Sequence, residues 1–151
     1  MSGALAGRCL CGAVRYRVRP GFRMRPYACH CHDCQRRTGS AFGIQLAVAE
    51  ADLDVEGEVL EGRHVQPSGA VAGIFACSAC LTRLWTSNDR RPGIVNLRAG
   101  TLDDSPTLEP AAHFWTSSKQ PWIALPADVP ALAAQPETPG EWMQLLGPET
   151  A

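Results

Sequence analysis

The sequence predicts a mainly β domain made of short antiparallel strands. Apolar and polar residues alternate in two early stretches, turn residues bound the other apolar runs, and no segment before residue 126 keeps the apolar period of a helix. With 151 residues, of which 45% are hydrophobic and 19% charged, the composition is that of one soluble folding unit.

Five segments are expected to form strands. Alternating apolar residues indicate half-buried strands at residues 14–18 and 42–48. Runs of β-forming residues between Gly, Pro, Asn, Asp or Ser indicate three more strands, at residues 71–76, 83–86 and 93–99.

Two short helical segments are also expected. Residues 33–37 are the only polar, helix-compatible stretch next to a tight loop, which predicts one helical turn there. Trp142, Leu145 and Leu146 have the spacing of one helix face, which predicts a helix at residues 141–146. This face could dock on the body of the protein or on a second copy of the chain, as a homodimer, and a frayed terminus is the alternative.

The amino-acid composition of the chain changes at Pro126. From there on, five prolines punctuate an Ala-rich stretch that a regular sheet could not accommodate. We therefore expect a folded domain over residues 1–125 and a C-terminal tail, which carries the short helix, over residues 126–151.

The charge balance argues against partners chosen by bulk electrostatics. The 14 Lys and Arg residues nearly match the 15 Asp and Glu residues, and the formal net charge is −1, so binding to nucleic acid is not expected. Five arginines between residues 15 and 25 could form a local basic face, but alternating arginines on a strand usually mark its solvated side.

The chain shows neither a membrane span nor a secretory signal. No segment approaches the roughly 18 continuous apolar residues of a span, and residues 1–7 lack the basic and apolar regions of a signal peptide. We expect a cytoplasmic protein with reduced thiols and no membrane partner.

Seven cysteines fall into three groups with the spacing of metal ligands. These are a C-x-C pair (Cys9, Cys11), a C-x-C-x-x-C triplet (Cys29, Cys31, Cys34) and a C-x-x-C pair (Cys77, Cys80). Such spacings let neighbouring sulfurs turn toward one ion, and thiolates prefer zinc or iron, with zinc as the first choice. Disulfides suit the pattern less well, because the two cysteines of a C-x-C bridge poorly.

Two metal sites account for every cysteine. The triplet can occupy three corners of a tetrahedron by itself, which leaves the two distant pairs to combine into a four-sulfur site. We call Cys9, Cys11, Cys77 and Cys80 the closed cluster, and Cys29, Cys31 and Cys34 the open cluster. Three protein ligands and one exchangeable position are typical of a site that does chemistry. The alternative is that His30, His32 or another histidine fills the fourth position and the ion has only a structural role.

Wider motifs around the cysteines point to a family. The motifs are Gly7-Arg8-Cys9-Leu10-Cys11-Gly12-Ala13-Val14, Cys29-His30-Cys31-x-x-Cys34-Gln35-Arg36 with Gly39, Cys77-x-x-Cys80, and the closing stretches at residues 98–103 and 113–122. Over about residues 7–125 they resemble the glutathione-dependent formaldehyde-activating enzyme family, which includes centromere protein V.

This resemblance implies a fold, a metal content and an activity. The fold is a β-tent of twisted antiparallel sheets stapled by zinc, with a structural zinc in the closed cluster and a catalytic zinc in the open cluster, or two ions per chain. The partner is glutathione or a similar small thiol, and the activity is that of a carbon–sulfur lyase similar to S-(hydroxymethyl)glutathione synthase. Leu81 stands where the family usually has glycine, so we expect a modified turn there.

A site of three thiolates favours a thiol substrate over hydrolytic water. Three thiolates leave a Zn²⁺ complex with a formal charge of −1, which makes it a poor electrophile but an acceptable binder of one more soft ligand. The bound thiol would lose its proton and could add to an aldehyde such as formaldehyde, and the reverse reaction cleaves a carbon–sulfur bond.

Five other side chains are candidates for contacts with the substrate. Arg36 and Arg37 could neutralise the thiolates or clamp a carboxylate of glutathione, and solvated surface arginines are the alternative. His113, which lies among aromatic residues, could relay a proton or orient the substrate, although such a histidine is often a core residue. Ser118 and Lys119 could line the pocket.

The competing hypothesis is a zinc-stabilised module without catalysis that binds protein or nucleic acid. The net charge and the single lysine, Lys119, count against nucleic acid.

Overall fold

Short strands make up most of the regular structure, as the alternation of apolar residues predicts. The computed structural model describes residues 3–148 and divides into two units. Within the described residues, unit 1 comprises residues 3–23 and 47–107, and unit 2 comprises residues 24–46 and 108–148. Each unit holds one of the two cysteine clusters, so each is described separately.

A three-stranded antiparallel sheet in unit 1 has the order β1-β2-β5. Its strands are β1 (Leu5–Arg8), β2 (Arg15–Val18) and β5 (Leu53–Glu56). In β2 buried and exposed residues alternate, which places Tyr16 in the core and the arginines outside. The strand register sets Arg15 opposite Glu56 and Arg17 opposite Asp54. The outer arginines of β2 therefore stand opposite acidic residues and do not form a purely basic face.

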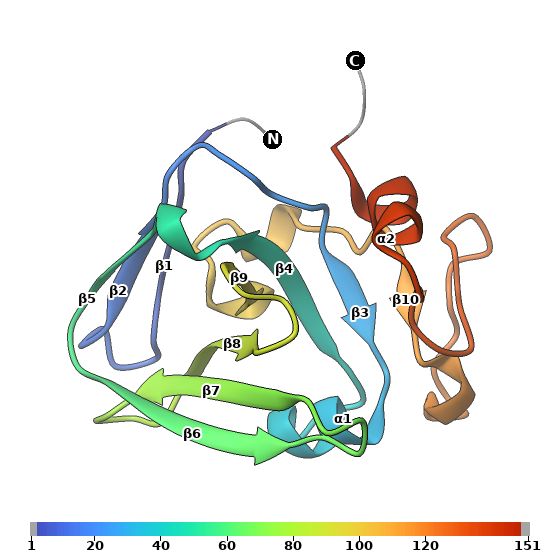
Figure 1. Ribbon diagram of the computed structural model, residues 1–151, viewed down its shortest axis with the longest axis horizontal. Coiled ribbons are helices and arrows are strands. Elements are labelled where there is room, and N and C mark those ends of the chain that lie inside the picture. Colours follow the sequence, from blue (N-terminus) through green and yellow to red (C-terminus); the bar gives the residue numbers. More distant parts are fainter. Residues whose placement is uncertain (1–2, 149–151) are drawn as a thin grey trace. The chain divides into compact units, whose positions relative to one another are not determined.

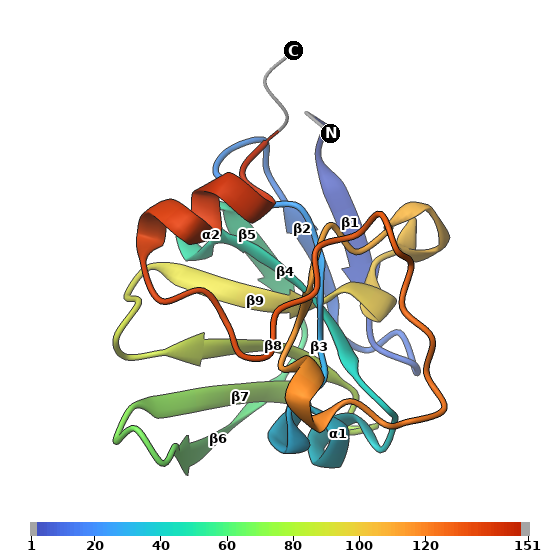
Figure 2. The ribbon, with the colours of Figure 1, turned by 90° about the vertical axis from the view of Figure 1, so that its right-hand side faces the viewer.

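Four further strands of unit 1 form an antiparallel meander, shown side by side in Figure 2. They are β6 (Val59–Val65), β7 (Val71–Cys77), β8 (Arg83–Asn88) and β9 (Ile94–Arg98). Three 3-10 turns of unit 1 lie outside this meander: η1 (Glu50–Asp52) precedes β5, and η2 (Ala99–Thr101) and η3 (Ser105–Thr107) follow β9. β9 is almost entirely buried, whereas β6 is almost entirely exposed. Because β6 has no buried face, its sequence shows no alternation and the strand was not expected.

Strand β3 (Tyr27–Cys29) is central to unit 2. It pairs antiparallel with β4 (Gly43–Ala49), of which residues 43–46 belong to this unit, and parallel with β10 (His113–Phe114). Helix α1 (His32–Thr38) follows β3, and the 3-10 turn η4 (Thr116–Ser118) follows β10 (Figure 1). The parallel pair is a local exception to the antiparallel pairing that the sequence predicts.

Helix α2 (Pro139–Leu146) confirms the helix expected near the C-terminus. Thr138 caps its first turn, together with Glu141 in a capping box. The apolar face packs on unit 2, where the Trp142 ring lies 5.5 Å from that of Tyr27 and Leu146 is fully buried. The side chain of Arg25 donates hydrogen bonds to the carbonyl oxygens of the last turn. Figure 1 shows α2 and β10 beside β3.

The segment after residue 125 also contacts β10. The backbone of His113 donates to Pro130 O and accepts from Leu132 N, both at 2.8 Å. The boundary between a domain at residues 1–125 and a tail at 126–151 stays a prediction, and its outermost residues, 1–2 and 149–151, lie outside the described residues. Within residues 3–148, no helix has both the length and the apolarity needed to cross a membrane.

Candidate functional site

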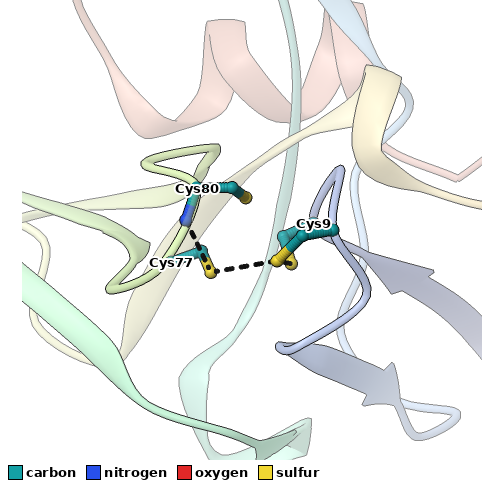
Figure 3. A group of neighbouring side chains, drawn as sticks. Cys9, Cys77 and Cys80 are labelled. Atoms are coloured by element: carbon teal, nitrogen blue, oxygen red, sulfur yellow. Dashed lines mark hydrogen bonds between the residues drawn. The ribbon is translucent and has the colours of Figure 1, made fainter.

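The closed cluster forms where two loops of unit 1 meet. Cys9 and Cys11 lie in the loop between β1 and β2, and Cys77 and Cys80 lie at the turn between β7 and β8. The four Sγ atoms all lie within 4.8 Å of one another. Figure 3 shows Cys9, Cys77 and Cys80 approaching one another from these two loops. The pairing of the first and last cysteine groups, expected from the spacing, is present in the structure.

Backbone hydrogen bonds shape both loops of the closed cluster. Cys9 N donates to Val14 O at 3.0 Å, and Leu81 N donates to Cys77 O at 2.9 Å. A third bond, from Leu10 N to Thr82 Oγ1 at 3.1 Å, joins one loop to the other. The sulfurs are therefore held by the fold of the loops themselves.

Amide groups and one hydroxyl make hydrogen bonds with sulfurs of the closed cluster. Val14 N donates to Cys9 Sγ at 3.3 Å, and Cys80 N donates to Cys77 Sγ at 3.5 Å. The hydroxyl of Thr82 lies 3.1 Å from Cys80 Sγ and is the main cause that lowers the pKa of Cys80 to about 5. The thiolate is the form of cysteine that binds metal.

The distances in the closed cluster fit a tetrahedral metal ion. Cys9 Sγ lies 3.6 Å from Cys11 Sγ, which lies 3.9 Å from Cys77 Sγ. Zinc with Zn–S bonds of about 2.3 Å sets its sulfurs about 3.8 Å apart, whereas a disulfide needs about 2.05 Å. The cysteines are free thiols in the structure, and the donor set suits a soft divalent ion.

Leu81 keeps the turn that glycine would make. Its φ is 59°, in the left-handed region, although a β-carbon there costs roughly 1–2 kcal/mol. The prediction that leucine would change this turn is therefore wrong, because Leu81 adopts the left-handed backbone conformation that glycine would have there. The side chain is 65% exposed and gains little from burial.

The open cluster forms at the junction of β3 and α1 in unit 2. Cys29 ends β3, Cys31 is the N-cap of α1, and Cys34 lies in its first turns. Their three Sγ atoms lie within 4.8 Å of one another. Cys31 Sγ accepts a hydrogen bond from Cys34 N at 3.3 Å, as an N-capping side chain does. The local turn alone brings these three sulfurs together.

The three thiols of the open cluster form hydrogen bonds with one another, and these bonds shift their pKa values in opposite directions. Hydrogen bonds from Cys29 and Cys34 lower the pKa of Cys31 far below its usual value. The reciprocal bonds with Cys31 and Cys34, together with burial, raise the pKa of Cys29 well above its usual range. One thiolate shared among three sulfurs is the expected state without a cation, and a divalent cation would favour three thiolates.

Side chains from the rest of unit 2 support the open cluster. Gln45 on β4 donates from Nε2 to Cys34 Sγ at 3.5 Å and is 7% exposed. Cys29 and Cys34 belong to a buried apolar group with Phe114 and Leu146. The sulfurs are thus set into the core of the unit rather than into an isolated loop.

The geometry does not support a histidine as the fourth ligand. Among the described residues, no histidine nitrogen joins the three sulfurs of the open cluster. His30 instead places its Nε2 atom 3.0 Å from Nδ1 of His113, and His32 is exposed. Three protein ligands with one position for another group is the arrangement that these atoms provide.

The other candidate residues have different surroundings. Arg36 and Arg37 lie in the last turn of α1, where cations favour the helix dipole, and Arg36 is exposed. Ser118 Oγ donates to His30 O at 3.0 Å. Lys119 Nζ donates to Ile123 O at 2.7 Å and Gln120 O at 3.2 Å. Their part in binding a substrate stays a prediction.

Three residues have supporting roles that the sequence did not assign: His30 was considered there only as a metal ligand, Gln35 only as part of a family motif, and Gln45 not at all. Gln35 Nε2 donates to His30 O at 2.8 Å and to Ser118 O at 2.9 Å, which ties α1 to the turn after β10. The only sequence signal was adjacency, since His30 and Gln35 flank ligand cysteines. Gln45 gave no signal, because its contact depends on the pairing of β3 with β4.

The fold and the two cysteine clusters define a mainly β protein with two candidate metal centres, one closed by four sulfurs and one open. The chain belongs to the glutathione-dependent formaldehyde-activating enzyme family, whose family model matches residues 4–118.

Two further similarities agree with this family and with the fold. A protein of Halomonas elongata, whose name assigns it to the glutathione-dependent formaldehyde-activating enzymes, is 29% identical over 160 residues, which cover 96% of this chain and 98% of that protein. A crystal structure of a Rhodobacter sphaeroides protein matches with a TM-score of 0.53 and 20% identity, covering 83% of this chain and 98% of that one. The second similarity concerns the fold alone.

Proposed function

We propose that this protein is a zinc-dependent carbon–sulfur lyase or synthase, similar to S-(hydroxymethyl)glutathione synthase. Its substrate is the adduct of glutathione, or a similar small thiol, with an aldehyde such as formaldehyde. Family membership supports the choice of thiol and aldehyde. The observation that carries the proposal is the division of seven cysteines into a four-sulfur and a three-sulfur cluster, the second without a histidine.

The chain would hold one zinc ion in each cluster. The closed cluster offers four sulfurs and stabilises the loops of unit 1, while the open cluster offers three. Zinc, when bound in the open cluster, would supply a position at which a thiol is favoured as its thiolate. The amide of Gln45 and the N–H of Cys34 would orient the protein sulfurs there.

The reaction needs a nucleophilic sulfur and a donor for oxygen. The thiol first gives its proton to water. The thiolate sulfur then forms a bond to the carbonyl carbon, the C=O π bond breaks, and its electron pair goes to the oxygen, which takes a proton back from the solvent, so that no net proton is released. In this proposal His113 contacts the substrate, while Arg36, Arg37 and Lys119 supply positive charge for its carboxylates. Ser118 acts indirectly, since its hydroxyl is bonded to the backbone of His30.

Zinc content and thiol titration test the proposal together. We expect two zinc ions per chain, saturable binding of glutathione in calorimetry, and faster exchange between ¹³C-formaldehyde and its glutathione adduct in NMR than without protein. The Cys31→Ser variant, with one zinc and no thiol binding, is the matched control. Two zinc ions without a response to any small thiol would instead indicate a metal-stabilised binding module.

A cytoplasmic location and a homodimer belong to the same proposal. Because α2 already covers its own unit with its apolar face, a homodimer would use another surface. Light scattering on the zinc-loaded protein would give the mass in solution, and a monomer at all concentrations would exclude the dimer.

A further inference from the structure

Two buried histidines in unit 2 contact each other through their rings. His30 is fully buried and His113 is 7% exposed, and His30 Nε2 lies 3.0 Å from His113 Nδ1. The parallel pairing of β3 with β10 brings them together, and the ring of Phe42 lies 5.1 Å from that of His30. This pair is not part of either cysteine cluster.

The hydrogen bond between the rings allows only two arrangements of protons. A neutral imidazole has one N–H and one lone pair, and a hydrogen bond needs an N–H on one ring facing a lone pair on the other. Either His30 donates from Nε2, and both rings are Nε2–H tautomers, or His113 donates from Nδ1, and both are Nδ1–H tautomers. The outer nitrogens, His30 Nδ1 and His113 Nε2, are therefore always opposite in character.

The surroundings of His30 favour the first arrangement. Its Nδ1 atom is buried and has no hydrogen-bond partner in the described part of the chain. A buried N–H without an acceptor is rarer in proteins than an acceptor without a donor, which favours a lone pair at this atom. A charged ring at either position would also put an N–H on His30 Nδ1, because a charged His30 carries a proton there, and a charged His113 donates to His30 Nε2 and leaves the proton of His30 on Nδ1. The lack of an acceptor for this atom among the described residues therefore favours two neutral rings.

The backbone of His30 is held in place from two directions. Its carbonyl oxygen accepts from Gln35 Nε2 at 2.8 Å and from Ser118 Oγ at 3.0 Å, and its N–H donates to Phe114 O at 2.9 Å. A ring fixed in this way can impose its tautomer on a neighbour.

We propose that His30 is a positioning residue that holds His113 as the neutral Nε2–H tautomer, so that His113 presents an N–H donor to the oxygen of the aldehyde. This inference rests on the proposed function. His113 then stabilises the negative charge that develops on oxygen as the carbon–sulfur bond forms, and it keeps its own proton. It acts as a hydrogen-bond donor and not as a base.

The tautomer can be measured without any substrate. Long-range ¹H–¹⁵N correlation spectra of the zinc-loaded, ¹⁵N-labelled protein distinguish Nε2–H from Nδ1–H rings. We expect both His30 and His113 as Nε2–H tautomers near neutral pH. An Nδ1–H or charged His113 would overturn the inference, whatever the enzyme's activity.

Two substitutions of His30 separate positioning from packing. His30→Gln keeps an N–H that can donate to His113 Nδ1, whereas His30→Leu removes it. With zinc content and melting temperature as controls, we expect His30→Leu to lower kcat for the thiol–aldehyde adduct about 10- to 100-fold with little change in KM, and His30→Gln to recover most of it. His64→Leu, on the exposed strand β6, is the matched control.

The outcomes distinguish this inference from the proposed function. Wild-type protein that turns over no thiol adduct would refute the proposed function, and the spectra would still report the tautomer. Full kcat in a zinc-loaded His30→Leu variant would refute the positioning of His113 alone. If His30→Leu does not fold, the wild-type spectrum still tests the tautomer of His113, and the kcat of His30→Gln still tests its positioning by His30.

Discussion

The two cysteine clusters differ in how the chain brings their sulfurs together. The closed cluster joins two loops far apart in sequence, and its sulfurs Cys11 and Cys77 are 66 positions apart. The open cluster comes from one short segment, residues 29–34, at the junction of a strand and a helix. A metal in the closed cluster therefore links distant strands, whereas a metal in the open cluster occupies a site that local structure has already formed.

The clusters also differ in what supports their sulfurs. Backbone amides of Val14 and Cys80 donate to the closed cluster, whose cysteines are partly exposed at Cys11 and Cys80. The open cluster has the Gln45 side chain and the buried apolar group around it. We therefore expect the closed cluster to contribute mainly to stability and the open cluster to be sensitive to substitution of its surroundings, and this comparison can be tested.

The largest effect is expected from Cys77→Ser, which removes a fully buried ligand of the closed cluster. Structural zinc contributes about 10–16 kcal/mol in small zinc-dependent domains, as much as the about 5–15 kcal/mol that a typical domain has in total. We expect an unfolded or strongly destabilised protein by circular dichroism. A cooperative melt near that of the wild type would show that the closed cluster is not structural.

Cys31→Ser should leave a folded protein with a defective open cluster. Because β3, α1 and the apolar group around them do not depend on this sulfur alone, we expect native circular dichroism, about half of the wild-type zinc, and no thiol turnover. Zinc analysis and adduct-exchange NMR give the readouts. If this variant and Cys77→Ser unfold alike, the division into structural and functional clusters is wrong.

Gln45→Leu should weaken the open cluster without emptying the closed one. It removes the N–H donated to Cys34 Sγ, and loss of such an outer partner typically costs about 10- to 100-fold in metal affinity or activity. Chelator competition should show one zinc ion released more easily and the other unchanged. Gln144→Leu, on the exposed side of α2, is the control. Equal zinc affinity of the open cluster in both variants would show that Gln45 does not support this cluster.

The smallest effects are expected at two left-handed residues, one in each unit. Leu81→Gly should relieve strain in the closed cluster and stabilise the zinc-loaded protein by about 1 kcal/mol or less, since glycine adds entropy to the unfolded chain. Gly39→Ala, at the end of α1, should destabilise it by roughly 1 kcal/mol although nothing crowds the position. Urea unfolding would measure the change in the free energy of unfolding for both variants. If the two changes had the same sign, the assignment of backbone strain to Leu81 would be wrong.

The sequence alone was enough to group the cysteines and to find β2, β4, β7, β8 and β9, although it missed the short strands β1 and β3, which also have buried residues. Short C-x-C and C-x-x-C spacings limit which sulfurs can reach one ion, and alternation reveals β2 because every second residue is buried. The alternation at 42–48 also located β4, although five of the seven residues of this strand are buried. The helix at the C-terminus was predicted for the same reason, since Trp142, Leu145 and Leu146 must lie on one face.

Only the tertiary structure decided the contacts made across long stretches of chain. β6 is exposed on nearly every residue and β10 has only two, so neither leaves a pattern. His30 and His113 are 83 positions apart, and nothing in either segment specifies that β3 and β10 pair in parallel. Ligand spacing is a local property of the chain, whereas the partner of a buried ring depends on which strands pair and in which register.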